Sequence, residues 1–191
     1  MRKALKLGLF LCIVAGIAGL AIAYVNDLTQ PLIEQQMEAK KLNSFQEVYP
    51  EIEEVKDESE QYLNSNTDPL LTEVHVIYQA NTPVGVIYMV EPSGYNGKIQ
   101  LLVGADILDK KITAIKVLSQ SETPGLGSQA TESFFRSRFQ GKSMGKQLEI
   151  VTKEPVEENQ VLAITSATIT SQAVTGGVNV VRQHFLDNFG G

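Results

Sequence analysis

An uncharged run of nineteen residues, LGLFLCIVAGIAGLAIAYV from Leu7 to Val25, constrains this chain more than any other feature. At about 1.5 Å of rise per residue, a helix over the run is about 30 Å long, the hydrocarbon thickness of a bilayer. Three basic residues precede the run, and Asn26 and Asp27 follow it. Because positive flanking charge stays in the cytoplasm, the pattern predicts a single-pass anchor, residues 1–27, with the rest of the chain outside the cytoplasm.

A cleaved signal peptide is the alternative interpretation of the same run. Ala21, Ile22 and Ala23 have the small-x-small pattern of a cleavage site, and a basic segment precedes the apolar one. The run is longer than the apolar part of most signal peptides, which favours a retained anchor. Both interpretations predict that the rest of the chain lies outside the cytoplasm. Small residues along the run, such as Gly16 and Gly19, suit packing against other membrane proteins of a complex.

The rest of the chain is acidic and has no metal-binding pattern. Residues 26–191 hold 13 basic and 22 acidic side chains, a formal charge of −9, so binding to nucleic acid is not expected. The single cysteine, Cys12, lies in the apolar run, so the sequence offers no internal disulfide and no cysteine cluster for zinc or iron–sulfur centres. His75 and His184 lack partners at metal spacing and are interpreted as surface or hydrogen-bonded core residues.

Residues 28–50 predict a helix that connects the anchor to the exported part of the chain. Pro31 fits its first turn, apolar residues recur near the helical period, and Pro50 ends it. We expect this helix to continue the membrane helix after a short break. Residues 51–70 are expected to form a loop.

Four segments rich in Val, Ile and Tyr follow, and turn signals separate them. Short connections between such strands favour antiparallel pairing. Residues 51–191 are therefore expected to form one α+β domain, an antiparallel sheet with flanking helices. The four strands are predicted at 73–80, 84–90, 99–106 and 112–118.

Two helices and one more strand are predicted after these four strands. The segment 130–139 is amphipathic and predicts a helix with Phe134 and Phe135 facing inward. The segment 147–152 predicts a short strand. Apolar residues at helical spacing predict a last helix over 170–188.

Three stretches carry residues that suit a ligand. The stretch 94–97, GYNG, places two glycines beside an aromatic ring, although alone it is most simply a hairpin turn. The stretch 121–127, SETPGLG, combines a Pro-Gly turn with a second glycine, and such loops aim backbone N–H groups and hydroxyls at ligands. The hydroxyl-rich stretch 165–171, TSATITS, precedes a helix whose N-terminus could hold phosphate. Alternatively, Thr170 or Ser171 simply caps that helix.

The ordered set GYNG, LVGAD, ETPGLG and TSATITSQAV resembles the FMN-binding domain of the G subunit of Rnf electron transport complexes. It is similar, more distantly, to the C subunit of the sodium-pumping NADH:quinone reductase, and the resemblance covers nearly the whole chain. In that family the motif reads Asp-x-x-Ser/Thr-Gly-Ala-Thr, and a flavin transferase moves FMN from FAD onto the last threonine through its phosphate. The matching residue is Thr168, preceded by Thr165 and Ala167 in matching places, whereas Leu162 replaces the family Asp and Ser166 the Gly.

The resemblance implies an electron carrier in a complex of the bacterial inner membrane that oxidises ferredoxin, reduces NAD and translocates Na⁺ or H⁺. FMN on Thr168 would supply the redox chemistry, so the chain has no catalytic residue of its own and does not catalyse the overall reaction alone. The implied partners are the other Rnf membrane subunits and the flavin transferase.

Within this resemblance, Glu122 and Thr123 are expected to contact the isoalloxazine, with Leu126 as an apolar wall and Tyr95 at its border. The implied cofactor-binding residues are Thr168, Thr165, Ser166, Ala167, Thr170, Glu122, Thr123, Gly125, Leu126, Gly127 and Tyr95.

Three other functions compete with this one. The C subunit of the quinone reductase has a related domain, although the modest length of this chain favours the Rnf assignment. A stand-alone membrane-anchored flavin-binding module would act without the other membrane subunits. A non-redox scaffold would be colourless and gives no reason for ETPGLG and the hydroxyl-rich stretch to occur together.

Overall fold

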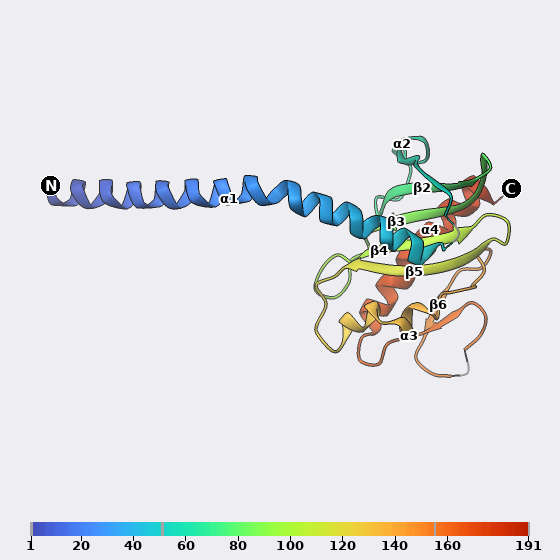
Figure 1. The fold of residues 1–191 in the computed structure, drawn as a ribbon. Coiled ribbons are helices and arrows are strands. Elements are labelled where there is room, and N and C mark those ends of the chain that lie inside the picture. The colour runs from blue at the N-terminus through green and yellow to red at the C-terminus, as the bar shows by residue number, and fades with distance from the viewer. Residues whose placement is uncertain (1, 51, 155, 191) are drawn as a thin grey trace. The chain divides into compact units, whose positions relative to one another are not determined.

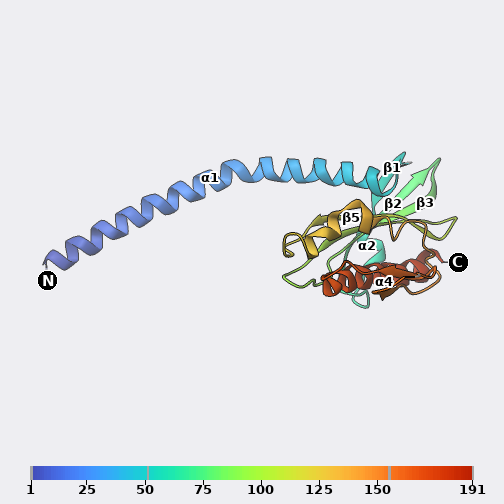
Figure 2. The same cartoon turned by 90° about the horizontal axis from the view of Figure 1, so that it is seen from below.

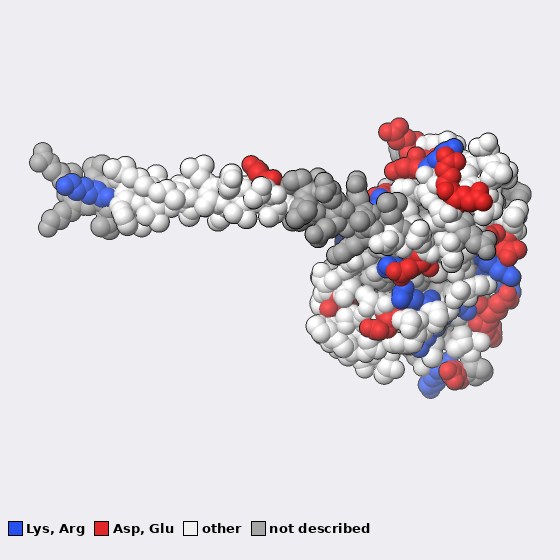
Figure 3. Space-filling model, viewed as in Figure 1, with Lys and Arg blue, Asp and Glu red and all other residues white. Residues whose placement is uncertain are grey.

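The computed structural model describes residues 2–50, 52–154 and 156–190, in two compact units, Met1–Leu42 and Asn43–Gly191. Almost all of the first unit is helix α1 (Arg2–Val48), whose last residues belong to the second unit (Figure 1). Within α1, Gly8–Gln30 is long and apolar enough to cross a membrane, and none of it is buried. Its only charged residue is acidic and lies near its C-terminal end (Figure 3).

The expected break between the membrane helix and the connecting helix is absent, so that prediction was wrong. Helix α1 continues through Pro31, and the hydroxyl of Thr29 donates a hydrogen bond to the carbonyl oxygen of Val25 at 2.9 Å. The sequence has no glycine between Gly19 and Pro50 that could end the helix earlier. Pro50 does stop it, as predicted, because the residue before a proline is disfavoured in the helical conformation.

The second unit is built on a five-stranded sheet in which each strand pairs with its neighbour in sequence, always antiparallel. The predicted antiparallel sheet is thus confirmed, with the four expected strands at its centre and far edge. The loop expected over 51–70 was wrong, because this stretch contains the edge strand β1 (Glu54–Asp57) and the short helix α2 (Ser59–Tyr62). The sequence of β1, EVKD, lacks the apolar alternation that marks a strand. The elements are β1 (Glu54–Asp57), α2 (Ser59–Tyr62), β2 (Leu71–Gln79), β3 (Thr82–Val90), β4 (Gln100–Asp106) and β5 (Lys111–Ser119).

Both faces of this sheet are covered, which explains why its central strands are apolar at nearly every position. In β3, Val86, Tyr88 and Val90 lie in the core on one face, while Ile87 and Met89 lie in a second core on the other. Successive strand side chains point to opposite faces, so a strand buried on both sides reads as a continuous apolar run. The larger core lies between the sheet and helix α4 (Thr168–Phe189). Figure 2 shows α4 along one side of the sheet.

The end of α1 covers the opposite face of the sheet. Phe45, Val48 and Tyr49 are buried there against residues of β2, β3 and β4. The Tyr49 hydroxyl donates a hydrogen bond to Asp106 Oδ2 at 3.1 Å, and its ring lies over Gly85, where a Cβ would overlap it. The connecting helix therefore ends as an integral part of the domain.

The chain between the sheet and α4 is less regular than predicted. In place of one helix over 130–139, a 3₁₀ turn η1 (Gly127–Thr131) and a single helical turn α3 (Ser133–Arg136) are separated by Glu132, whose backbone is extended. This interruption rotates the helix face, so Phe135 is fully buried but Phe134 is 46% exposed. The inward orientation expected for Phe134 was therefore wrong. A parallel pair, β6 (Glu149–Val151) and β7 (Gln160–Leu162), follows, and only β6 was predicted.

Helix α4 packs on the sheet with the apolar face that its sequence predicts. Val174, Val178, Val181 and Phe185 are all fully buried. Adjacent glycines at 176 and 177 lie in the middle of this helix with different surroundings. A Cβ on Gly177 would lie 3.0 Å from Pro92 Cγ, whereas a Cβ on Gly176 would meet nothing within 4 Å.

These two glycines give a matched test of the packing. Gly176→Ala should stabilise the protein by about 0.5–1 kcal/mol, because alanine has the lower conformational entropy cost in a helix. Gly177→Ala should show no such gain, because crowding against Pro92 offsets it. Thermal unfolding of both variants measures the difference, and equal stabilisation by the two would contradict the close contact between α4 and Pro92.

Candidate functional site

A cavity of about 560 Å³ lies where the three ligand-suited stretches of the sequence meet. Nine of the eleven predicted cofactor-binding residues line it, although they lie up to 75 positions apart in the chain. Gly125 and Thr165 are not among its lining residues, whereas Ile169, which was not predicted, is. The lining residues are Tyr95, Glu122, Thr123, Leu126, Gly127, Ser166, Ala167, Thr168, Ile169 and Thr170.

The N-terminus of α4 forms one wall of this cavity and has no side-chain cap. The residue at the N-cap position is Ala167, which carries no hydrogen-bonding side chain. The helix starts at Thr168, two residues earlier than predicted, so its first-turn N–H groups belong to cavity-lining residues. Uncapped N–H groups and the partial positive charge of a helix N-terminus favour an anion at this wall.

Neither hydroxyl proposed as an alternative cap performs that role. The Ser171 hydroxyl accepts a hydrogen bond from the Ile164 N–H and donates one to the Ala167 carbonyl oxygen, both at 2.9 Å. The Thr170 hydroxyl donates to Glu122 Oε2. Both side chains thus hold the helix start to neighbouring segments and leave its N–H groups uncapped.

Glu122 is a buried carboxylate that joins the three stretches around the cavity. Glu122 is 5% exposed. Its Oε1 accepts a hydrogen bond from the Asn96 N–H at 2.9 Å, and its Oε2 accepts one from the Thr170 hydroxyl. Burial opposes ionisation, but the hydrogen bonds from Thr170 and from the backbone N–H groups of Asn96 and Tyr95 outweigh it and lower the pKa of Glu122. Glu122 is therefore an ionised group whose two oxygens both have protein donors.

Two glycines leave space for this carboxylate because they have no Cβ. A Cβ on Gly94 would lie 2.6 Å from Glu122 Oε1, and a Cβ on Gly127 would lie 2.6 Å from Oε2. The sequence predicts turn glycines in both GYNG and ETPGLG. In the structure these two let the backbone approach Glu122.

The loop that carries Glu122 is held by its own turn. Gly125 has a φ of +75°, and its N–H donates to the Ser128 hydroxyl oxygen at 2.9 Å. The Leu126 N–H donates to the Thr123 carbonyl oxygen at 3.1 Å, and the Asn96 side chain donates to the Thr123 hydroxyl at 3.2 Å. Gly125 therefore shapes the loop from outside the cavity.

The cavity combines an apolar rim with a polar floor. The side chains of Tyr95, Leu126 and Ile169 line it and are exposed, whereas Glu122 and Thr170 are buried. Among the described residues that line it, Glu122 is the only charged one. A flat aromatic ligand that carries an anionic group fits this arrangement, with the ring at the rim and the anion at the helix start. Ile169 was missed in the sequence because hydroxyls, and not apolar side chains, made its stretch stand out.

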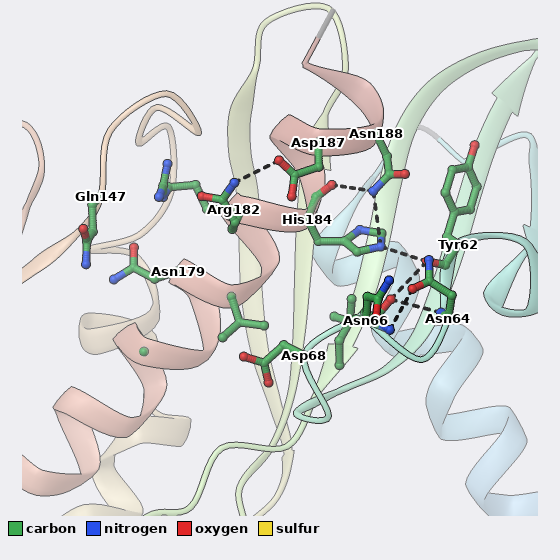
Figure 4. A pocket seen from close by; sticks show the side chains of 15 residues that line it. Tyr62, Asn64, Asn66, Asp68, Gln147, Asn179, Arg182, His184, Asp187 and Asn188 are labelled. Atoms are coloured by element: carbon green, nitrogen blue, oxygen red, sulfur yellow. Dashed lines mark hydrogen bonds between the residues drawn. The ribbon is translucent and has the colours of Figure 1, made fainter.

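A second cavity, of about 660 Å³, lies between the outer face of α4 and the loop that follows α2 (Figure 4). Much of its polar lining is bonded to the protein. Asn179 exchanges two hydrogen bonds of 2.9 Å with the backbone of Leu148, and His184 Nε2 lies 3.2 Å from the Tyr62 carbonyl oxygen. None of the predicted cofactor-binding residues lines it. These polar groups tie α4 to the segment before β6 and to the end of α2, so the first cavity is the stronger candidate.

The chain matches two protein families along its length. Residues 94–183 match the FMN-binding domain family, and residues 1–48 match the N-terminal region of RnfG. The first match includes all three ligand-suited stretches.

Two curated relatives cover most of the chain. The G subunit of the Na⁺-translocating ferredoxin:NAD⁺ oxidoreductase complex of Acetobacterium woodii is 34% identical over 92% of this chain and 88% of its own. The G subunit of the ion-translocating oxidoreductase complex of Erwinia tasmaniensis is 35% identical over 91% of this chain and 85% of its own.

Solved structures of another protein share the fold. The C subunit of the Na⁺-translocating NADH-quinone reductase of Parabacteroides distasonis superposes with a TM-score of 0.54 at 22% identity, over 72% of this chain and 77% of its own. NqrC of Shewanella oneidensis superposes with a TM-score of 0.52 at 19% identity, over 62% and 60%. The two matched families and the long alignments with the two G subunits lead to one conclusion: the chain belongs to the RnfG family.

Proposed function

We propose that this protein carries FMN, bound covalently through its phosphate to Thr168, and relays electrons as the G subunit of an Rnf-type ion-translocating complex. One observation carries the proposal: Thr168 opens an uncapped helix N-terminus inside a cavity with an apolar rim. A hydroxyl in that place puts its oxygen beside the N–H groups that would hold a phosphate. The match of residues 94–183 to the FMN-binding domain family supports FMN as the ligand.

The charges around the cavity favour a covalent phosphodiester over free FMN. A phosphomonoester carries about −1.5 to −2 charges near neutral pH, whereas a diester carries about −1. The described lining offers no basic side chain to balance a dianion, and it holds the ionised carboxylate of Glu122. The helix start supplies only about half a positive charge. A single negative charge held by a covalent bond therefore suits this cavity better than a freely bound dianion.

The attachment reaction is a transfer of FMN from FAD, for which the implied partner is a flavin transferase. The Thr168 hydroxyl oxygen forms a bond to the phosphorus of the FMN half, and the phosphoanhydride bond of FAD breaks. AMP leaves with the electron pair of that bond, and the hydroxyl proton passes to the transferase or to solvent. Thr168 remains an attachment point and takes no further part in turnover.

Once bound, the flavin supplies the redox chemistry, and the chain positions it. The first-turn N–H groups of α4 would hold the phosphate, and the exposed Tyr95, Leu126 and Ile169 would border the ring. These rim positions lie at the surface, so a partner can approach the ring closely. Glu122 would act behind the ring and phosphate, because both of its oxygens already accept hydrogen bonds from the protein.

The relatives favour a role in an Rnf complex over the quinone reductase or a stand-alone module. Identity to the two G subunits reaches 34–35% over most of the chain, whereas the two NqrC structures share only 19–22%. The relative from A. woodii is named as part of a ferredoxin:NAD⁺ oxidoreductase, so we assign this chain to a complex of that class. A single cysteine cannot hold an iron–sulfur cluster, so this chain would contribute only its flavin. It would therefore be one electron carrier among several in the complex.

We further propose that α1 anchors the protein in the bacterial inner membrane by a single span, with the flavin domain outside the cytoplasm. The stretch Gly8–Gln30 is long enough to span, and the basic residues of the chain start lie on its N-terminal side. The other membrane subunits would pack against this span.

Electron flow through the assembled complex tests the function. Membranes that contain the complex should reduce NAD⁺ with reduced ferredoxin, and the rate should fall to background when this protein carries Thr168→Val. A complex with Thr168→Ser should keep activity. Undiminished NAD⁺ reduction by a complex in which this protein is free of flavin would place it outside the electron path.

A further inference from the structure

The backbone just before Thr168 adopts a conformation that L residues avoid. The Ala167 N–H donates to the Ile164 carbonyl oxygen at 3.0 Å, which closes a turn, and Ser166 has a φ of +63° at the third position of this turn. Positive φ at that position is characteristic of glycine, because a Cβ costs free energy there. The other described non-glycine residues with positive φ are Ala80, Asn81 and Lys110, which lie in hairpin turns.

This turn cannot relax independently of the helix start. The Ser171 hydroxyl accepts a hydrogen bond from the Ile164 N–H and donates one to the Ala167 carbonyl oxygen, which ties both ends of the turn to the first turn of α4. The Ser171 N–H donates to the same carbonyl oxygen at 3.0 Å. A change of φ at Ser166 would therefore move Thr168 relative to the helix N–H groups.

The hydroxyl of Ser166 does not explain the conformation. Ser166 is exposed and lines the cavity, and in the described part of the chain its side chain makes no hydrogen bond. No side-chain contact of Ser166 therefore offsets the free-energy cost of its positive φ. Uncompensated backbone strain of this kind is typical of functional sites. The structural feature of this position is therefore its left-handed backbone conformation.

We propose that Ser166 is a positioning residue for FMN attachment, and that it presents the Thr168 hydroxyl through its left-handed backbone and not through its own hydroxyl. This inference rests on the proposed attachment of FMN to Thr168. It predicts which substitutions the transfer reaction tolerates. Residues that accept positive φ preserve the presentation of Thr168, and β-branched residues, which are strongly disfavoured there, disrupt it.

Four variants of the full-length protein separate the backbone from the hydroxyl. With FAD and a flavin transferase, the initial rate of FMN mass gain should remain within about threefold of wild type in Ser166→Gly, Ser166→Ala and Ser166→Asn. Ser166→Val should slow the transfer at least about tenfold in kcat/KM, since a β-branched side chain disfavours the left-handed backbone. Thermal unfolding of the flavin-free proteins shows whether each is folded at the assay temperature.

The outcomes distinguish this inference from the proposed function. Wild-type kcat/KM in a folded Ser166→Val variant would overturn the positioning role. Slow transfer in both Ser166→Gly and Ser166→Ala would also overturn it, because it would assign the role to the hydroxyl. If Thr168→Val gained the FMN mass as wild type does, the attachment site itself would be wrong. If Ser166→Val proves unfolded, the glycine and alanine variants still decide between backbone and hydroxyl.

Discussion

Thr168→Val is expected to remove covalent FMN from this protein completely. Valine has nearly the shape of threonine but lacks the oxygen that would bond to phosphorus, so the fold stays intact and attachment is lost. After co-expression with a flavin transferase, intact-mass spectrometry of the wild type should show an added mass of roughly 438 Da, the FMN residue bound as a diester. The variant should show the mass of the unmodified chain.

Two control variants make this result specific to one hydroxyl. Thr168→Ser keeps a hydroxyl at the helix start and should retain the added mass. Thr165→Val removes a neighbouring hydroxyl that is exposed and lies outside the cavity lining. This variant should also retain the added FMN mass. Persistence of the FMN mass in Thr168→Val would contradict attachment at Thr168.

Glu122→Ala is expected to destabilise the protein strongly, by about 3 kcal/mol. The substitution leaves the Asn96 N–H and the Thr170 hydroxyl without an acceptor in a buried place, and it opens space between the three stretches. For a chain of this size, each kcal/mol shifts the unfolding temperature by about 2–4 °C, so a decrease of roughly 10 °C is expected. Glu122→Gln should cost about 1 kcal/mol, because its amide can still pair with both groups.

The lowered pKa of Glu122 gives this prediction a pH dependence of known sign. A carboxyl group whose pKa is lower in the folded state adds stability above its unfolded pKa of about 4.5. That stability is lost as the pH falls through the folded value. The difference in unfolding temperature between wild type and Glu122→Gln should therefore be constant near neutral pH and shrink below about pH 4.5. A difference independent of pH down to acid unfolding would show that the charge of Glu122 has no role in stability.

The strands of the sheet were predictable because their burial is encoded locally. Continuous apolar runs in β3 and β4 come from burial on both faces, and turn residues mark their ends. The edge strand β1 was not predictable in this way, because one of its four residues is apolar and pairing with β2 alone defines it. The interruption at Glu132 likewise depends on tertiary packing, since the surrounding sequence keeps a helical period.

The residues of the candidate site were predictable by type, but their roles depended on the fold. The three stretches stood out because glycines and hydroxyls gather there, and the sheet brings them to one cavity. The role of Glu122 was not visible in the sequence, because its partners Asn96 and Thr170 lie 26 and 48 positions away. Gly127 similarly looked like a turn residue until the structure placed it against that carboxylate.

Peptide mapping of the flavin-loaded protein identifies the residue that carries FMN. Cleavage after lysine and arginine releases the peptide 154–182, which contains every hydroxyl of the stretch 165–171. Fragmentation should place the FMN mass on Thr168 alone, with Thr165, Ser166 and Thr170 unmodified. An FMN mass on any other residue, or a flavin-replete preparation in which this peptide is unmodified and no flavin remains after denaturation, would contradict covalent attachment at Thr168.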